Sequence, residues 1–159
     1  KNERERSNVD QWLFWQMGGL GPMAGQAHHF RMYAPQFTKE KLTYSKKRYT
    51  NEVNRLYGVM NKQLRKNDYL AGRYSIADMA CWGWILPSKI STKMQGQKLK
   101  DFPHLFKWFE KVGKRPAVQK GLDVGKVMRM LAKASRSGLS EKTKEAKKAR
   151  SLLFNQKAR

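Results

Sequence analysis

One cysteine gives this sequence its most obvious reactive side chain. Cys81 supplies the chain's single thiol, and a thiolate is a nucleophile suited to redox chemistry. A lone thiol forms no internal disulfide, which fits a reducing compartment such as the cytoplasm. Cys81 lies within an apolar run, where a free cysteine behaves as a small buried side chain. We therefore predict a core position for Cys81 rather than a redox role.

Two adjacent imidazoles, His28 and His29, are the next candidates. Imidazole is a common metal ligand. Adjacent residues on a helix, however, point about 100° apart and make a poor shared ligand pair. We predict one packed and one solvated imidazole, and no metal site.

The pair Ser75 and Asp78 has the spacing of a capping box. The serine hydroxyl accepts from a free N–H of the first helical turn, and the carboxylate reaches back to the N–H of the cap residue. The pair therefore predicts the start of a helix, and losing such a cap costs about 0.5–2 kcal/mol. The residues that follow are apolar nearly all round, which predicts a central helix that other helices surround. They are Met79, Ala80, Cys81, Trp82, Trp84, Ile85 and Leu86.

Further helices are predicted on both sides of this central one. Residues 9–17 indicate the end of a helix whose beginning is partly missing, and the Gly- and Pro-rich residues 18–22 indicate an interruption. The glycines either weaken the helix or permit close backbone approach, and Pro22 suits a first turn. A second helical piece then runs from about Pro22 to Tyr33.

The longest predicted helix carries apolar residues at spacings of three and four. They are Tyr49, Val53, Leu56, Met60 and Leu64. Pro87 is expected to end or kink the central helix, residues 88–101 show no helical period, and Pro103 starts another helix. No segment alternates as a strand would, so the predicted fold class is all-α.

Charge and size limit the classes of protein further. The 159 residues are enough for one domain, and the formal net charge is +22. Such a surface attracts polyanions through non-specific phosphate contacts, although the lysines can equally lie on solvated helix faces. Residues 126–159 hold eleven Lys or Arg against two Glu, and we predict a basic helical tail there. No apolar run approaches the roughly 20 residues of a membrane span.

The order of motifs resembles that of a known family. Residues 11–30, QWLFWQMGGLGPMAGQAHHF, resemble the opening of the helical domain in Nu-class glutathione transferases. These are bacterial enzymes with glutathione-dependent disulfide-bond reductase activity, and the globular domain of the fungal nitrogen-regulator prion protein is similar. The Arg48-Tyr49 pair, the Ser75 cap and residues 114–118 (KRPAV) follow in the family's order. The resemblance covers residues 9 to about 125.

The resemblance implies a two-domain protein of which this chain holds the C-terminal helical bundle. Residues 1–8 would be a partial leading helix or linker, residues 9–125 the helical domain and residues 126–159 the tail. The N-terminal thioredoxin-like domain, absent from this chain, would hold the glutathione thiolate, which attacks a small electrophile or disulfide. The resemblance also implies a cytoplasmic homodimer with glutathione as co-substrate, and predicts that this chain alone is inactive.

Site residues follow from the same resemblance. Arg48 and Gln11 match residues near glutathione, and no catalytic residue is expected in this chain. The wall for the co-substrate would comprise Trp12, Trp15, Met23 and Phe30, although an aromatic stripe at helical spacing is also typical of a core. The alternative is a non-catalytic glutathione-transferase-like module that binds a protein or a polyanionic partner, which the basic charge favours.

Overall fold

The structure is a computed structural model that describes residues 2–125. These residues begin with one continuous helical segment. Its first helix starts at Glu3, and the Asn2 side chain caps it by accepting from the Glu5 N–H at 2.8 Å. Residues 3–8 are therefore helical. The successive elements are α1 (Glu3–Trp15), the π-helical η1 (Gln16–Leu20), α2 (Gly21–His28), the π-helical η2 (His29–Tyr33) and the 3-10 turn η3 (Ala34–Gln36).

The predicted interruption at residues 18–22 is wrong, because the backbone stays right-handed helical through η1 into α2. Pro22 lies in the first turn of α2, where the missing N–H costs little. Gly21 serves close packing instead. A Cβ there would lie 2.7 Å from Nε2 of Gln16 and 3.2 Å from the Trp84 ring. The glycine thus lets the Trp84 ring pack against the backbone of α2.

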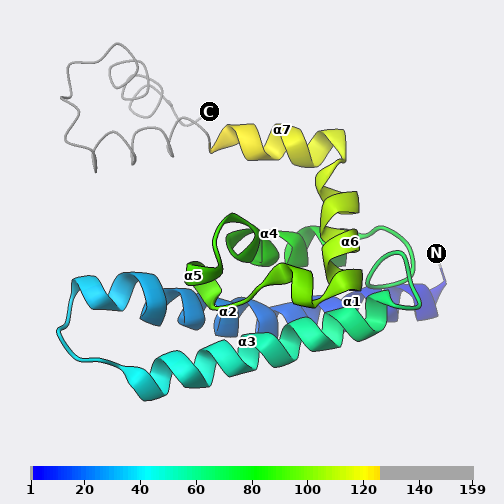
Figure 1. Cartoon of the computed structure of the whole chain (residues 1–159). Coiled ribbons are helices and arrows are strands. Elements are labelled where there is room, and N and C mark those ends of the chain that lie inside the picture. The colour runs from blue at the N-terminus through cyan, green and yellow to red at the C-terminus, as the bar shows by residue number, and fades with distance from the viewer. Residues whose placement is uncertain (1, 126–159) are drawn as a thin grey trace, which may run out of the picture. The chain divides into compact units, whose positions relative to one another are not determined.

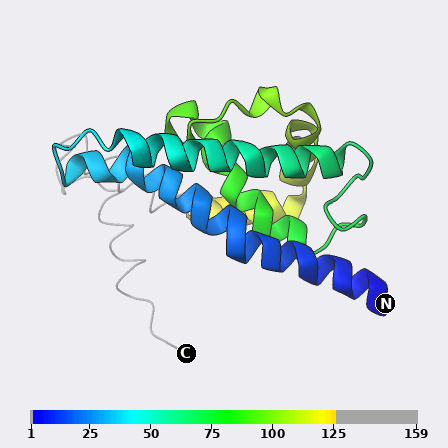
Figure 2. The same ribbon diagram turned by 90° about the horizontal axis from the view of Figure 1, so that it is seen from below.

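Helix α3 (Thr43–Leu64) runs back antiparallel along the α1–α2 segment, as Figures 1 and 2 show. The predicted apolar stripe is its buried face, except that Tyr49 is half-buried and Tyr57 joins the stripe. Helix α2 packs against this face. The long hairpin is therefore held by side chains at the spacings read from the sequence.

Helix α4 (Ile76–Ile90) begins at the predicted capping box, with Ser75 and Asp78 both engaged. Trp82 and Ile85 are buried, as expected of a central helix. The prediction that other helices surround α4 on every side is wrong for its first turns. Ile76 is 56% and Met79 54% exposed, because no described element covers that face.

Pro87 lies inside α4 rather than at its end. Proline removes the hydrogen bond to the carbonyl four residues earlier, and here that carbonyl belongs to the exposed Gly83, where water can replace the partner. The stretch without a sequence period then folds into α5 (Thr92–Gln95) and the 3-10 turn η4 (Leu99–Asp101).

Helix α6 (Pro103–Gly113) starts at the predicted proline and packs on α4. The Trp82 ring stacks on Phe109 with centroids 4.8 Å apart, and its Nε1–H donates to the Phe109 carbonyl at 3.0 Å. Within residues 2–125 the only extended pairing is an isolated bridge between Ala71 and Arg73. The all-α class is therefore confirmed.

The chain divides into two compact units, Lys1–Val112 and Gly113–Arg159. The described part of the second unit contains α7 (Pro116–Val124). The predicted basic tail, residues 126–159, lies outside the described residues. In the part of the chain that the structure describes, none of the helices has the length and apolar character to cross a membrane.

Candidate functional site

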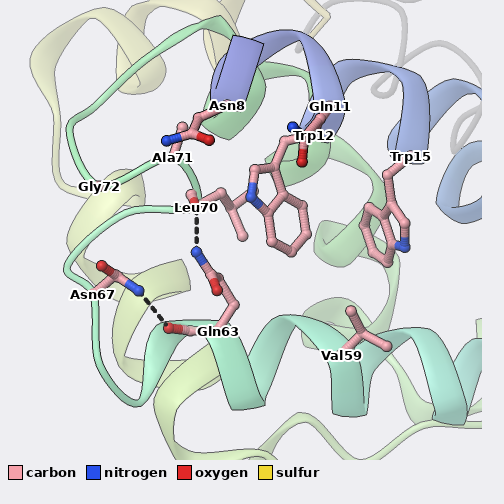
Figure 3. A pocket seen from close by; sticks show the side chains of 10 residues that line it. All are labelled: Asn8, Gln11, Trp12, Trp15, Val59, Gln63, Asn67, Leu70, Ala71 and Gly72. Carbon is pink, nitrogen blue, oxygen red and sulfur yellow. Dashed lines mark hydrogen bonds between the residues drawn. The ribbon is translucent and has the colours of Figure 1, made fainter. Parts of the chain in front are cut away.

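A hollow of about 470 Å³ lies between α1, the C-terminal half of α3 and the loop that follows α3. Figure 3 shows that Trp12 and Trp15 project from α1 toward Val59 and Gln63 of α3. The lining combines apolar rings with amide side chains, a composition that suits a small polar ligand with an apolar part. It comprises Asn8, Gln11, Trp12, Trp15, Val59, Gln63, Asn67, Leu70, Ala71 and Gly72.

Hydrogen bonds fix the loop side of this hollow. Gln63 donates its Nε2–H to the Leu70 carbonyl at 2.7 Å, and Asn67 donates its Nδ2–H to the Gln63 carbonyl at 3.1 Å (Figure 3). On the opposite side the Trp12 and Trp15 rings meet edge to face, with centroids 5.1 Å apart. Gln11 is exposed at the rim, so its amide is accessible to a ligand.

Arg48 lies on α3, is exposed, and directly precedes Tyr49, whose ring stacks on Phe30. The rings of Phe30 and Tyr49 are parallel, with centroids 5.3 Å apart. Glu52, the nearest carboxylate along the helix, is held by Arg55 through two hydrogen bonds of 2.9 and 2.7 Å. The bond from Arg55 lowers the pKa of Glu52, and the charge of Arg48 acts in the same direction. In the described chain Arg48 itself forms no ion pair, so its guanidinium is available to an anion.

The structure separates the predicted site residues into two groups. Gln11, Trp12 and Trp15 share the hollow, whereas Arg48 and Phe30 lie toward the other end of α3. Eleven residues separate Arg48 from Val59 of the hollow, about 16 Å along a helix. The backbone of an extended tripeptide such as glutathione spans only about 10 Å. Arg48 and Phe30 therefore do not line the hollow that Gln11, Trp12 and Trp15 share.

Met23 belongs to neither group. It lies on α2, half-buried, and does not line the hollow. Because α2 packs against α3, we interpret the half-buried Met23 as a residue at the edge of the hydrophobic core.

Sequence reasoning missed the polar residues of the hollow, Asn8, Gln63 and Asn67. Gln63 and Asn67 are half-buried although they lie next to charged residues in the sequence. A partial signal was present, because Gln63 follows Val59 at a spacing of four, on the same helix face. That spacing does not predict that the loop after α3 folds back to line the hollow.

The sequence also did not predict a buried polar cluster formed by Tyr57, Ser88 and Gln95. The Tyr57 hydroxyl lies 3.0 Å from Oγ of Ser88 and 2.7 Å from Oε1 of Gln95, and burial raises the pKa of Tyr57. Gln95 also donates its Nε2–H to the Trp84 carbonyl at 3.1 Å. The cluster ties α3, α4 and α5 together and is closed to solvent, so its role is to position these helices.

The two histidines differ as predicted. His28 is half-buried and stacks on Tyr33 with centroids 5.1 Å apart, and burial lowers its pKa. His29 is exposed. No group of three or more His, Cys, Asp or Glu side chains within residues 2–125 is arranged to hold a metal ion.

Cys81 is fully buried in α4, as predicted for a core residue. Burial, assisted by the nearby negative charge of Asp78, raises the pKa of its thiol to about 12. The side chain is therefore a protonated thiol at neutral pH, which makes it a poor nucleophile.

We expect the Cys81 thiol to resist Ellman's reagent in the folded protein at about pH 8, since only thiolates react rapidly. The measurement is the absorbance released over an hour, with the same chain in guanidinium as the positive control. Because Cys81 is the single cysteine, any released absorbance reports on it alone. Complete reaction of the folded chain within seconds would show an accessible thiolate instead.

The sequence of this chain is similar to those of a known protein family. The profile described as "Glutathione S-transferase, C-terminal domain" matches residues 27–122. Disulfide-bond oxidoreductase YfcG of Escherichia coli is 45% identical over 120 residues, covering 75% of this chain and 52% of the relative. The chain thus spans about half the length of that relative.

Two solved structures share the fold. A glutathione transferase family member from Pseudomonas fluorescens, with two glutathione bound, has a TM-score of 0.65 and 36% identity. The match covers 74% of this chain and 52% of that one. A glutathione transferase from Pseudomonas putida, with one glutathione disulfide bound per subunit, has a TM-score of 0.68 and 33% identity, covering 77% and 53%.

Proposed function

Because this chain belongs to the glutathione S-transferase family through its C-terminal helical domain, we propose that it supplies the substrate side of a glutathione-dependent enzyme. The enzyme is a glutathione transferase or a glutathione-dependent disulfide reductase. The observation that carries the proposal is the similarity to an oxidoreductase that acts on disulfide bonds. Transferase structures with glutathione and glutathione disulfide bound support it.

In this proposal the glutathione thiolate attacks one sulfur of a disulfide, and the second sulfur leaves as a thiolate. Nucleophilic attack needs the thiolate form, so positive charge near the reacting sulfurs favours both attack and departure. Arg48 supplies such a charge from α3, and no carboxylate pairs with it in the described chain. We infer that the stacked Phe30 and Tyr49 rings offer an apolar surface to the co-substrate.

A homodimer accounts for the separation of Gln11 from Arg48. Within one chain Gln11 lines the hollow and Arg48 does not, and in this proposal Gln11 of a second copy approaches the ligand that Arg48 contacts. Phe14 and Met17, which are 78% and 68% exposed on the segment that carries Gln11, supply apolar surface for such an association. The lone buried thiol is consistent with a reducing compartment, and we propose a cytoplasmic location.

The alternative of a non-catalytic binding module receives no support from the matched relatives. The net charge of +22 nonetheless supports a weaker property, a non-specific attraction to polyanions. That attraction is spread over the surface and falls with added salt, whatever the enzyme's substrate.

We expect the 159-residue chain alone to show no tight, saturable binding of glutathione and no turnover. The reason is that we expect the thioredoxin-like half to hold the main anchors of glutathione and the residue that faces its sulfur. Isothermal titration with millimolar glutathione measures the binding directly, and YfcG of Escherichia coli serves as the positive control. Saturable binding of glutathione by the chain would move the site into the helical domain and contradict this assignment.

A further inference from the structure

A second hollow, of about 570 Å³, lies where the C-terminal end of α3 meets α6. We call it the basic hollow, because cationic side chains from both helices line it. Arg65 and Lys66 come from the end of α3, and Lys107 and Lys111 lie one turn apart on α6. The remaining lining residues are Leu64, Asn67, Asp68, Gly72, His104 and Trp108.

Most of the positive charge in the basic hollow is not neutralised. Lys111 pairs with Asp68 at 3.1 Å and lies over the Tyr69 ring at 4.6 Å. Within the described chain Arg65, Lys66 and Lys107 form no ion pair with a carboxylate. Asp68 is therefore the single carboxylate among four lining cations.

A structural role explains only part of this arrangement. The negative end of the α3 dipole attracts cations at its C-terminus, which accounts for Arg65 and Lys66. Lys107 lies one turn into α6, beyond the first turn where the helix dipole acts, so the dipole does not account for it. Its presence in the same hollow as Arg65 and Lys66 is thus not explained by the helix dipole.

We propose that the basic hollow binds a compact ligand carrying at least two closely spaced phosphates, such as a nucleoside triphosphate. Arg65, Lys66 and Lys107 would donate charge-assisted hydrogen bonds to the phosphate oxygens, as arginine and lysine do in other phosphate sites. The volume falls in the range of small-molecule sites, about 300–1,000 Å³. A concave surface on one side of the molecule favours a compact anion over an extended nucleic acid strand, which needs a long basic track.

The inference does not rest on the glutathione chemistry proposed above, because it uses none of Gln11, Arg48 or the aromatic wall. It also differs from the general attraction to polyanions. A discrete site saturates at one ligand per chain and depends on particular residues, whereas a delocalised attraction does not.

The test is a calorimetric titration of the full chain with sodium tripolyphosphate at about 150 mM salt, where long-range attraction is screened. We expect saturable binding with a stoichiometry near one. The variant Arg65→Gln with Lys107→Gln should bind about tenfold more weakly, because two charge-assisted contacts are lost. Both side chains are exposed, so the variant should keep its helical circular dichroism spectrum. The single variant Lys107→Gln should show a smaller loss in the same direction.

Lys39→Gln with Lys41→Gln is the matched control. Both lysines are exposed and precede α3, whose 22 residues put about 33 Å between its ends. This variant removes the same charge and should change the affinity by less than about twofold. Equal losses in both double variants, or no saturation, would overturn the proposal in favour of delocalised attraction. Tighter binding of a single-stranded oligonucleotide than of ATP at the same residues would also overturn it.

Discussion

Replacing Asp78 by alanine should unfold much of this protein or bring it close to unfolding. The carboxylate is fully buried and accepts three N–H groups. They are the Leu70 N–H at 3.1 Å, the Trp108 Nε1–H at 2.8 Å and the Ser75 N–H at 3.0 Å. Each buried donor left without a partner costs about 1–3 kcal/mol, so the three together predict a loss of about 3–9 kcal/mol. Typical domains have only about 5–15 kcal/mol of stability in total.

Guanidinium unfolding, followed by circular dichroism and tryptophan fluorescence, measures this loss. Two variants bracket the result. Asp68→Ala removes an exposed aspartate that pairs with Lys111, and should cost less than about 1 kcal/mol. Ser75→Ala removes the hydroxyl of the cap but leaves the carboxylate, and should cost about 0.5–2 kcal/mol. A loss for Asp78→Ala no greater than that for Asp68→Ala would show that the three hydrogen bonds contribute little.

Replacing Arg48 by alanine should slow glutathione-dependent disulfide reduction by about 10- to 100-fold. The reason is the loss of a charge-assisted contact to the reacting complex, worth about 1.5–3 kcal/mol. The assay needs both halves of the enzyme, so we would join the half of YfcG that this chain does not match to the 159 residues. The measured quantity is kcat/KM for a small disulfide at saturating glutathione.

Lys47→Ala is the control for Arg48→Ala, since it removes a neighbouring exposed cation from the same helix. Adjacent helical residues point about 100° apart, so Lys47 should not reach the same ligand. Both variants should keep the helical content of the parent, because both side chains are exposed. Equal rates for the two variants would return Arg48 to the role of a solvated surface residue.

The sequence by itself determined those features whose physical cause is local. The Ser75 and Asp78 cap joins atoms three residues apart, and the stripe from Val53 to Leu64 repeats at the helical period. Pro103 likewise marks a helix start through its own missing N–H. Each of these depends on neighbours within one or two turns, so residue types and spacing are sufficient to predict it. The order of such motifs also identified the family, although the roles of Arg48 and Gln11 remain predictions.

Only the tertiary structure decided which distant residues meet. The sequence predicted Asp78 as a helix cap, but its bond to Trp108 depends on α6 packing against α4, 30 residues away. The hollow beside Trp12 required the loop after α3 to return over that helix. From the sequence, Gly21 could either weaken the helix or permit close backbone approach. The structure shows close approach, because the Trp84 ring packs against Gly21. Local spacing fixes which face a side chain occupies, whereas its partner across a helix interface is fixed by packing of the whole domain.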